Sequence, residues 1–231
     1  MSQKLINYCQ LAQAALEEEN QSSAEKFIEL ALQEEGGIEH PYALEVTAML
    51  MQNLGDFDSA KECLDRAVDT DKMHLADKIN QNDKSVDHNG IIRRMLALSE
   101  LYEGKEAFEL NKTALELNQE YNKENTSLNS EICAACAELY LSSLCMEADA
   151  ETQCNIFSEQ AVKFNQDNAD AWRVRASYFM SNEDLVQSKI CLQKSLELIK
   201  NDSIRDKLTN SQTTRILQLC IEHSFFKEAI G

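Results

Sequence analysis

A pair of small residues seven positions apart recurs five times along the chain. Seven residues are nearly two turns of an α-helix, so both members of a pair lie on one helix face. Small side chains on such a face let a neighbouring helix approach closely. The pattern predicts a repeated helical unit, and it points to an all-α fold. The pairs are Ala24 and Ala31, Ala60 and Ala67, Ala107 and Ala114, Cys154 and Ala161, and Ser188 and Ser195.

The rest of the sequence also favours helices. Its 231 residues include one proline and six glycines, the residue types that fit helix interiors least well. Near the N-terminus, apolar residues recur with helical spacing on two successive stretches, which contain Leu5 to Ala15 and Phe27 to Leu32. The short polar segment 17–22 lies between them. This arrangement predicts two helices joined as a hairpin.

The repeat resembles the tetratricopeptide repeat, a helical hairpin of about 34 residues. The fifth hairpin carries the most consensus residues: Trp172, Arg175, Ala176 and Phe179 in its first helix, then Ser188, Leu192 and Ser195 in its second. The resemblance implies a right-handed superhelix, an α-solenoid of helical hairpins. We expect a single array over 1–231, with hairpins at 3–35, 41–71, 91–118, 130–165 and 169–200 and a truncated sixth at 211–231.

Several stretches depart from the regular repeat. The polar segments 77–89 and 119–129 are expected to form loops, and 142–146 to lengthen the first helix of the fourth hairpin. The first helix of the third repeat is expected to be short, near 96–101. The sixth hairpin stops where its second helix should begin, around Ala229. A solenoid needs a capping helix, so we expect further native sequence beyond Gly231.

The irregular repeats are similar to those of a particular family, the eukaryotic assembly chaperones of large-subunit ribosomal protein four. The resemblance implies a groove that holds a long basic loop of that ribosomal protein until ribosome assembly. It implies work in both cytoplasm and nucleus, because the client is imported, and an acidic C-terminal extension that this sequence lacks. The matching segments are Ile132-Cys-Ala-Ala-Cys-Ala-Glu-Leu-Tyr140, Leu144-Cys-Met-Glu-Ala-Asp-Ala-Glu-Thr-Gln-Cys154, Asp170-Ala-Trp172, Leu196-Glu-Leu-Ile199 and Leu98 to Phe108.

The net charge of the chain limits the classes of partner that it is expected to bind. With 40 acidic and 22 basic residues, the formal net charge is -18. Such a surface repels nucleic acid and anionic membranes and attracts basic proteins. The alternative is that the charge only maintains solubility. No apolar run has the length of a signal peptide or a membrane span, which predicts a soluble intracellular protein, and a monomer is expected.

Cys133 and Cys136 form the only motif that suggests chemistry, because such pairs bind zinc or carry out redox reactions. A zinc site needs about four ligands, and the four histidines lack ligand spacing. Both cysteines also stand at apolar positions of a first helix, so we expect them to pack as small hydrophobic residues. Cys145 and Cys154 fit the same account; the alternative is a disulfide between them, which a reducing compartment disfavours. No nucleophile with a base, and no phosphate loop, can be assembled. We therefore expect neither metal, cofactor nor enzymatic activity.

In tetratricopeptide solenoids the first helix of each hairpin lines the concave groove. The residues expected to face that groove mix acidic with apolar side chains, which suits a lysine- and arginine-rich segment with apolar anchors. The alternative is an ordinary solvated face. The predicted partner-binding residues are Glu17, Tyr42, Glu45, Met49, Glu131, Glu138, Leu141, Asp170 and Met180.

Two other binding functions compete with a chaperone of a basic ribosomal protein. A co-chaperone adaptor would grip the acidic tails of heat-shock chaperones, which requires a clamp of basic side chains. The corresponding positions hold Cys9, Gln13, Val46 and Met49, with no basic pair. The other alternative is a scaffold subunit without a single client.

Overall fold

The computed structural model describes residues 2–81, 87–201 and 210–222 of the chain, and within these ranges all regular structure is helical. The predicted all-α class is therefore confirmed. The chain divides into two compact units, 1–102 and 103–231, and the boundary falls inside the third predicted hairpin. A single array over 1–231 stays a prediction, and each unit is described by itself.

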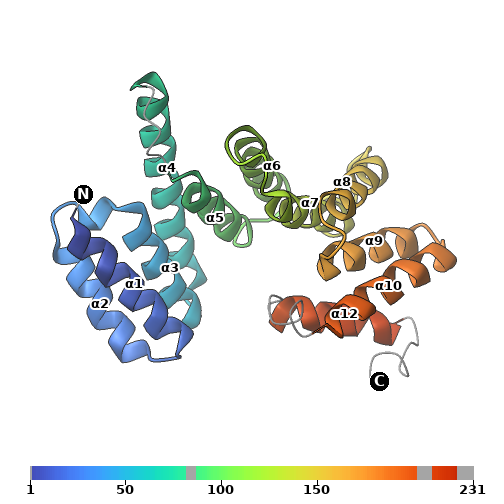
Figure 1. The fold of residues 1–231 in the computed structure, drawn as a ribbon, viewed down its shortest axis with the longest axis horizontal. Coiled ribbons are helices and arrows are strands. Elements are labelled where there is room, and N and C mark those ends of the chain that lie inside the picture. The colour runs from blue at the N-terminus through green and yellow to red at the C-terminus, as the bar shows by residue number, and fades with distance from the viewer. Residues whose placement is uncertain (1, 82–86, 202–209, 223–231) are drawn as a thin grey trace. The chain divides into compact units, whose positions relative to one another are not determined.

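Unit 1 contains two helical hairpins and one further helix (Figure 1). α1 pairs with α2 and α3 pairs with α4, while α1 also packs beside α3 and α5 beside α4. Leu5, Cys9, Ile28 and Val46 lie in the apolar core between the first three helices. The helices are α1 (Gln3–Glu17), α2 (Gln21–Gln33), α3 (Pro41–Asn53), α4 (Phe57–Gln81) and α5 (His88–Ser99), with the short 3-10 helix η1 (Gly37–Glu39) before α3.

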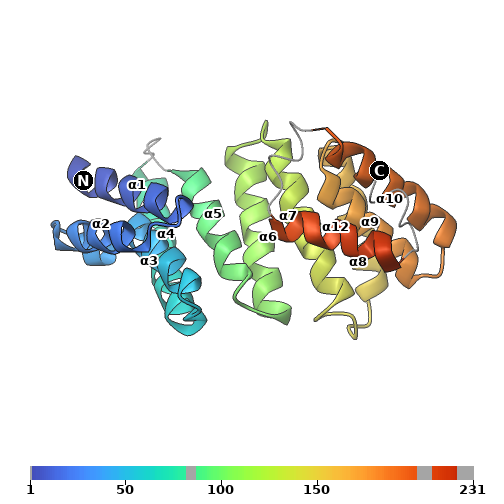
Figure 2. The same cartoon turned by 90° about the horizontal axis from the view of Figure 1, so that it is seen from below.

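Unit 2 repeats the hairpin arrangement (Figure 2). α7 pairs with α8 and α9 with α10, and the two first helices, α7 and α9, pack against each other. α6 packs on α7, and α12 contacts α9 and α10. Its helices are α6 (Gly104–Tyr121), α7 (Thr126–Leu141), α8 (Ala150–Phe164), α9 (Ala169–Ser181), α10 (Leu185–Ile199) and α12 (Asn210–Glu222).

The recurring small residues lie where helices meet. Cys154 is 2% exposed and the other nine members of the five pairs are 0% exposed, which confirms the predicted close packing. Serine can replace alanine in α10 because its hydroxyl finds a buried acceptor. The hydroxyl of Ser188 donates to the carbonyl of Ala176 at 2.8 Å, and that of Ser195 to the carbonyl of Ala169 at 2.7 Å.

The turns and helix starts follow local chemistry. Asn20, Asp56 and Asp184 each accept a hydrogen bond from a backbone amide in the first turn of the second helix, as N-cap residues do. The residue before each cap has a positive φ: Glu19 (56°), Gly55 (78°) and Glu183 (59°). Glycine adopts this conformation without strain, and the two glutamates do so at some cost.

Four expectations about the irregular segments differ from the structure, and two of them concern expected loops. α4 continues to Gln81 and α5 begins at His88, so within 77–89 only residue 87 is described outside a helix, and 82–86 lie outside the described residues. α6 and α7 also leave only 122–125 between them. Both stretches are rich in polar residues, which is why they resembled loops.

The first helix of the third repeat, α5, is longer than expected. The side chain of Asp87 caps it by accepting from the amide of Gly90 at 3.0 Å. Residues 142–146 do not lengthen α7, which ends at Leu141. The chain turns back there because the amide of Leu144 donates to the carbonyl of Leu139 at 2.8 Å. α12 occupies the first-helix position of the sixth hairpin, and its expected second helix lies outside the described residues.

Candidate partner-binding surface

All nine predicted partner-binding residues lie on first helices of hairpins. We term them the first-helix surface, and we describe its two parts separately. The part in unit 1 consists of Glu17 on α1 and of Tyr42, Glu45 and Met49 on α3. The part in unit 2 consists of Glu131, Glu138 and Leu141 on α7 and of Asp170 and Met180 on α9.

In unit 1, a tyrosine connects the two first helices. The hydroxyl of Tyr42 donates to the side-chain carbonyl of Gln13 on α1 at 2.8 Å. Burial raises the pKa of Tyr42, and nearby negative groups, Glu45 and Glu17 among them, raise it further. Glu17 is exposed and accepts a hydrogen bond from Gln13 at 3.1 Å. This part of the surface therefore combines an aromatic ring with negative potential.

The carboxylate of Glu45 is held by an arginine. The guanidinium of Arg94 on α5 donates to Glu45 at 2.9 Å and, through two nitrogens, to Asp71 on α4 at 2.6 and 3.1 Å. The side chains of Arg94 and Asp71 are each 7% exposed and that of Glu45 is 22% exposed. We term this set the Arg94 network; it ties α3, α4 and α5 together.

One guanidinium in the Arg94 network serves two carboxylates. Burial raises the pKa of both Glu45 and Asp71, and the attraction of Arg94 only partly opposes this shift. Burial by itself would lower the pKa of Arg94, but hydrogen bonds and charge from both acids outweigh it and raise that pKa. The three members of the network together carry a net charge of -1 when all are ionised.

A second arginine holds the acids of unit 2. The Nε of Arg173 on α9 donates to Asp170, one turn earlier on the same helix, at 2.6 Å. Its terminal nitrogens contact the carboxylate of Glu138 on α7. Arg215 on α12, which Figure 2 draws across these helices, also reaches Glu138 at 3.6 Å. We term these four residues the Arg173 network, in which two positive charges meet two negative ones.

The remaining residues of the first-helix surface differ in exposure. Glu131 is exposed, whereas Leu141 and Met180 are half-buried, and Met180 packs on the core between α9, α10 and α12. Met49 packs in the same way on the core of unit 1. The surface thus offers two exposed acids, three acids that pair with arginines of the protein, three partly buried apolar side chains and one aromatic ring. Its role in binding stays a prediction.

The internal role of the two arginines was not among the predictions. Arg94 falls within the apolar series Ile91, Met95 and Leu98 of α5, where a charged residue indicates a buried partner. That signal was available. Its partner Asp71 could not be identified from the sequence, because the pairing depends on how α4 packs against α5.

The cysteines behave as packed side chains. Cys133 and Cys136 are both 0% exposed, and burial raises the pKa of Cys133 to about 12 and that of Cys136 further. Thiols in this state are poor metal ligands and poor nucleophiles. Within the described ranges, no group of three metal-ligating side chains occurs. No helix among those described is both long and apolar enough to cross a membrane.

Both units are acidic. Unit 1 contains 19 acidic and 9 basic residues, and unit 2 contains 21 acidic and 13 basic residues. The negative charge is therefore distributed over the chain and is not concentrated in one tail. Such a distribution suits a partner whose positive charge is spread along an extended segment.

Comparison with known proteins gives both sequence and fold relatives, although no family model matches the chain. A stretch of 96 residues is 32% identical to a protein of Schizosaccharomyces pombe (strain 972) named probable assembly chaperone of rpl4. The match spans 40% of this chain and 29% of the relative.

Solved structures show the same fold. The assembly chaperone of RpL4 (Acl4, residues 1–338) matches with a TM-score of 0.73 and 20% identity, covering 97% of this chain and 86% of that one. PilF of Pseudomonas aeruginosa matches with a TM-score of 0.58 and 15% identity, covering 97% and 96%. The chain therefore resembles an assembly chaperone of ribosomal protein L4 in sequence, and it has the tetratricopeptide-repeat fold that Acl4 and PilF share.

Proposed function

We propose that this protein is a dedicated chaperone that binds a basic, extended segment of large-subunit ribosomal protein four and protects it until ribosome assembly. The observation that carries the proposal is the 32% identity over 96 residues to a probable assembly chaperone of rpl4. The net charge of -18 supports it, because a basic segment would be attracted to such a surface.

The first-helix surface is the proposed site. Glu17 and Glu131 are exposed and can meet lysine or arginine side chains of the client. Tyr42, Met49, Leu141 and Met180 can cover the aliphatic stems of those side chains. Glu45, Glu138 and Asp170 contribute through the two arginine networks, which hold their carboxylates in place before the client arrives. Fixed charges of this kind lose little side-chain entropy on binding.

The same proposal includes the cellular setting. A chaperone of an imported ribosomal protein works in both cytoplasm and nucleus, and we propose this distribution here. The protein acts as a monomer that binds and releases a client, without catalysis, cofactor or metal. Nucleic acid and membranes are not its ligands, since its charge repels both.

No observation supports the alternative function as a co-chaperone adaptor. Two of the clamp positions, Cys9 and Val46, are 0% exposed and cannot contact a ligand. Arg94 and Arg173, which lie on first helices, are engaged with carboxylates of the protein itself. A carboxylate ligand would have to displace those internal partners.

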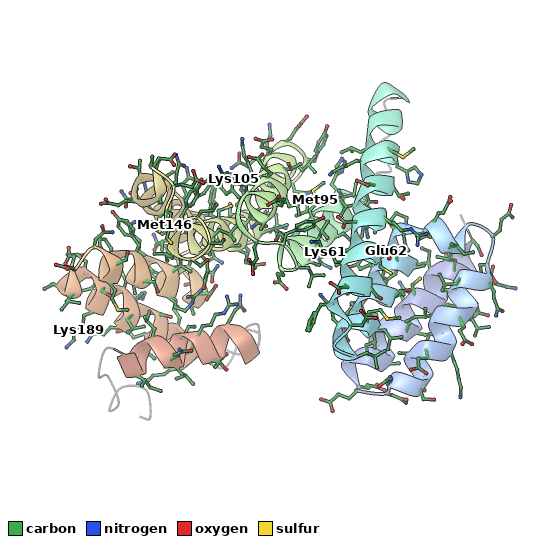
Figure 3. The ribbon with its side chains drawn as sticks, turned by 180° about the vertical axis from the view of Figure 1, so that it is seen from behind. Lys61, Glu62, Met95, Lys105, Met146 and Lys189 are labelled. Atoms are coloured by element: carbon green, nitrogen blue, oxygen red, sulfur yellow. The ribbon has the colours of Figure 1, made fainter. Side chains whose placement is uncertain are left out.

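The test compares two double variants with equal change in net charge. Glu17→Gln with Glu131→Gln removes the exposed acids of the first-helix surface. Glu29→Gln with Glu62→Gln removes exposed acids of the second helices α2 and α4; Glu62 is labelled in Figure 3. Glu45 and Glu138 are left intact, because changing either would also remove one of the two carboxylates with which Arg94 or Arg173 pairs. Isothermal titration calorimetry with ribosomal protein four at low and high salt gives the affinities.

We expect the first-helix variant to bind about 2- to 30-fold more weakly than the wild type at low salt, with the difference shrinking as salt screens the charges. The second-helix variant should bind almost as well as the wild type. Equal losses would mean that only bulk charge matters. A wild-type protein that holds no ribosomal protein four would contradict the chaperone function itself.

A further inference from the structure

The connection between α7 and α8 is unlike the other hairpin turns. Residues 18–20, 54–56 and 182–184 join the hairpins α1–α2, α3–α4 and α9–α10, three residues in each case. The α7–α8 loop, Ser142–Asp149, is eight residues long. The fourth repeat therefore carries five additional residues at one end of its hairpin.

The α7–α8 loop is fixed to the start of α6. The amide of Gly104 donates to the hydroxyl of Ser143 at 3.1 Å, and Lys105 forms an ion pair with Glu147 at 3.0 Å. Between these attachments, Leu144 is buried, with 5% of its surface exposed. The amide of Glu147 also donates to the carbonyl of Leu144 at 3.1 Å, which closes a turn over the intervening residues. Contacts on both sides thus hold the crest of the loop, Cys145 and Met146.

The crest presents a bare methionine to solvent. Met146 is 93% exposed, the highest value among the exposed large hydrophobic residues of the described chain (Figure 3). By comparison, Met73 on α4 is 69% exposed. A large apolar side chain gains free energy when it leaves water, so a fixed position in solvent suits a group that a partner covers. A thioether on an unbranched chain adapts readily to an apolar slot.

The surroundings of Met146 are negatively charged. Glu103, Glu106, Asp149 and Glu151 are exposed on the loop and on the adjoining starts of α6 and α8. Lys105 is the one basic residue among these neighbours, and Glu147 already pairs with it. The charge around the methionine is complementary to a basic surface.

We propose that the α7–α8 loop is a second docking point for the basic client, in which Met146 enters an apolar slot of the client and the surrounding acids meet its lysine or arginine residues. This inference rests on the proposed chaperone function. It adds a contact outside the first-helix surface, at the end of a hairpin. Two linked contacts raise the total affinity above that of either one.

Paired methionine variants test the docking point. Met146→Gln replaces the apolar side chain with a polar one of similar length, and Met73→Gln makes the same change at an exposed methionine elsewhere. Both proteins should melt like the wild type. We expect Met146→Gln to weaken binding of full-length ribosomal protein four about tenfold or more, as loss of a buried methionine contact requires. Met73→Gln should bind like the wild type, and Met146→Leu should retain most of the affinity.

Cys145 supplies a second readout. Its thiol is exposed beside Met146, whereas Cys133, Cys136 and Cys154 are buried with raised pKa values. Iodoacetamide should therefore modify Cys145 first, and bound ribosomal protein four should slow that reaction. Equal affinities of the two glutamine variants, or unchanged reactivity of Cys145 in the complex, would overturn the docking point and leave the chaperone function standing. A wild-type protein that binds no ribosomal protein four would overturn both.

Discussion

The Arg94 and Arg173 networks both neutralise a buried arginine with carboxylates, but their charge balance differs. Each places a buried arginine on a first helix and connects it to an acid on the preceding first helix, Glu45 or Glu138. The Arg94 network has one arginine for two carboxylates, whereas the Arg173 network has Arg215 as a second cation. The Arg94 network therefore keeps an excess negative charge, whereas the charges of the Arg173 network balance. Of the two networks, the Arg94 network should attract a positively charged client more strongly.

The second acid of each network has a different origin. Asp71 comes from α4, a second helix that continues to Gln81. Asp170 lies one turn before Arg173 on α9 itself. The Arg94 network consequently joins three helices, and its loss should loosen α3, α4 and α5 together. In unit 2, part of the network is local to one helix.

The largest expected effect comes from removing each arginine. Arg94→Met leaves two buried carboxylates without a partner and should lower the free energy of unfolding by about 3–5 kcal/mol. Arg173→Met should cost less, about 1–3 kcal/mol, because Arg215 still contacts Glu138. Urea unfolding gives both values. Circular dichroism follows the whole chain, while the single tryptophan, Trp172, reports on unit 2.

The neighbouring Arg93 supplies the control for this prediction. It is exposed on the same helix, so Arg93→Met should change stability little. The Arg94→Met transition should appear in circular dichroism with only a minor change in the fluorescence of Trp172. A larger loss from Arg173→Met than from Arg94→Met would contradict the assigned charge balance.

An effect of intermediate size, the loss of stability on enlarging a small residue between helices, should be the same in the two units. Ala67 in unit 1 and Ala161 in unit 2 occupy equivalent positions of second helices, and both are 0% exposed. Replacing either with leucine adds methylene groups to a close helix contact and should cost about 1–3 kcal/mol. Unequal losses in urea unfolding would show that the units differ in packing as well as in charge, and two neutral variants would contradict the repeat register.

The smallest effect concerns the uncompensated charge of unit 1. The pKa of Glu45 is raised above its usual value of 4.5, so the folded state holds its proton more tightly than the unfolded state. This contribution to stability is present below pH 4.5 and is lost as the pH rises through the raised pKa. Glu45→Gln resembles the protonated state of Glu45. As the pH rises from 4 to 7, the free energy of unfolding of this variant should therefore increase relative to that of the wild type, by less than about 1 kcal/mol.

Urea unfolding of both proteins across that range measures the difference. Asp71 is present in both, so its own titration contributes similarly to each curve. An advantage of Glu45→Gln that shrinks with rising pH would mean that Arg94 stabilises the ionised Glu45 more than burial opposes it. The ionised Glu45 would then not destabilise the folded state.

The fold was predictable where local rules decide it. The pairs of small residues, such as Ala24 with Ala31, predicted the helix contacts correctly. Each close contact requires small side chains, so the same pattern recurs in the sequence. The segments 77–89 and 142–146 were assigned wrongly. Polar helix turns and loops have similar composition, and a turn closed by the amide of Leu144 has no mark in the sequence. The pairing of Arg94 with Asp71 depends on helix packing, which residue order alone does not give.

The most direct test of the account asks which carboxylates the client covers. Coupling of glycine ethyl ester by a carbodiimide labels exposed acids, and mass spectrometry measures the rate at each one. When ribosomal protein four is bound, we predict slower labelling of Glu17 and Glu131 on the first helices and unchanged labelling of Glu29 and Glu62 on the second helices. Slower labelling of Glu29 and Glu62, with Glu17 and Glu131 unchanged, would place the client on the opposite face and contradict the central claim.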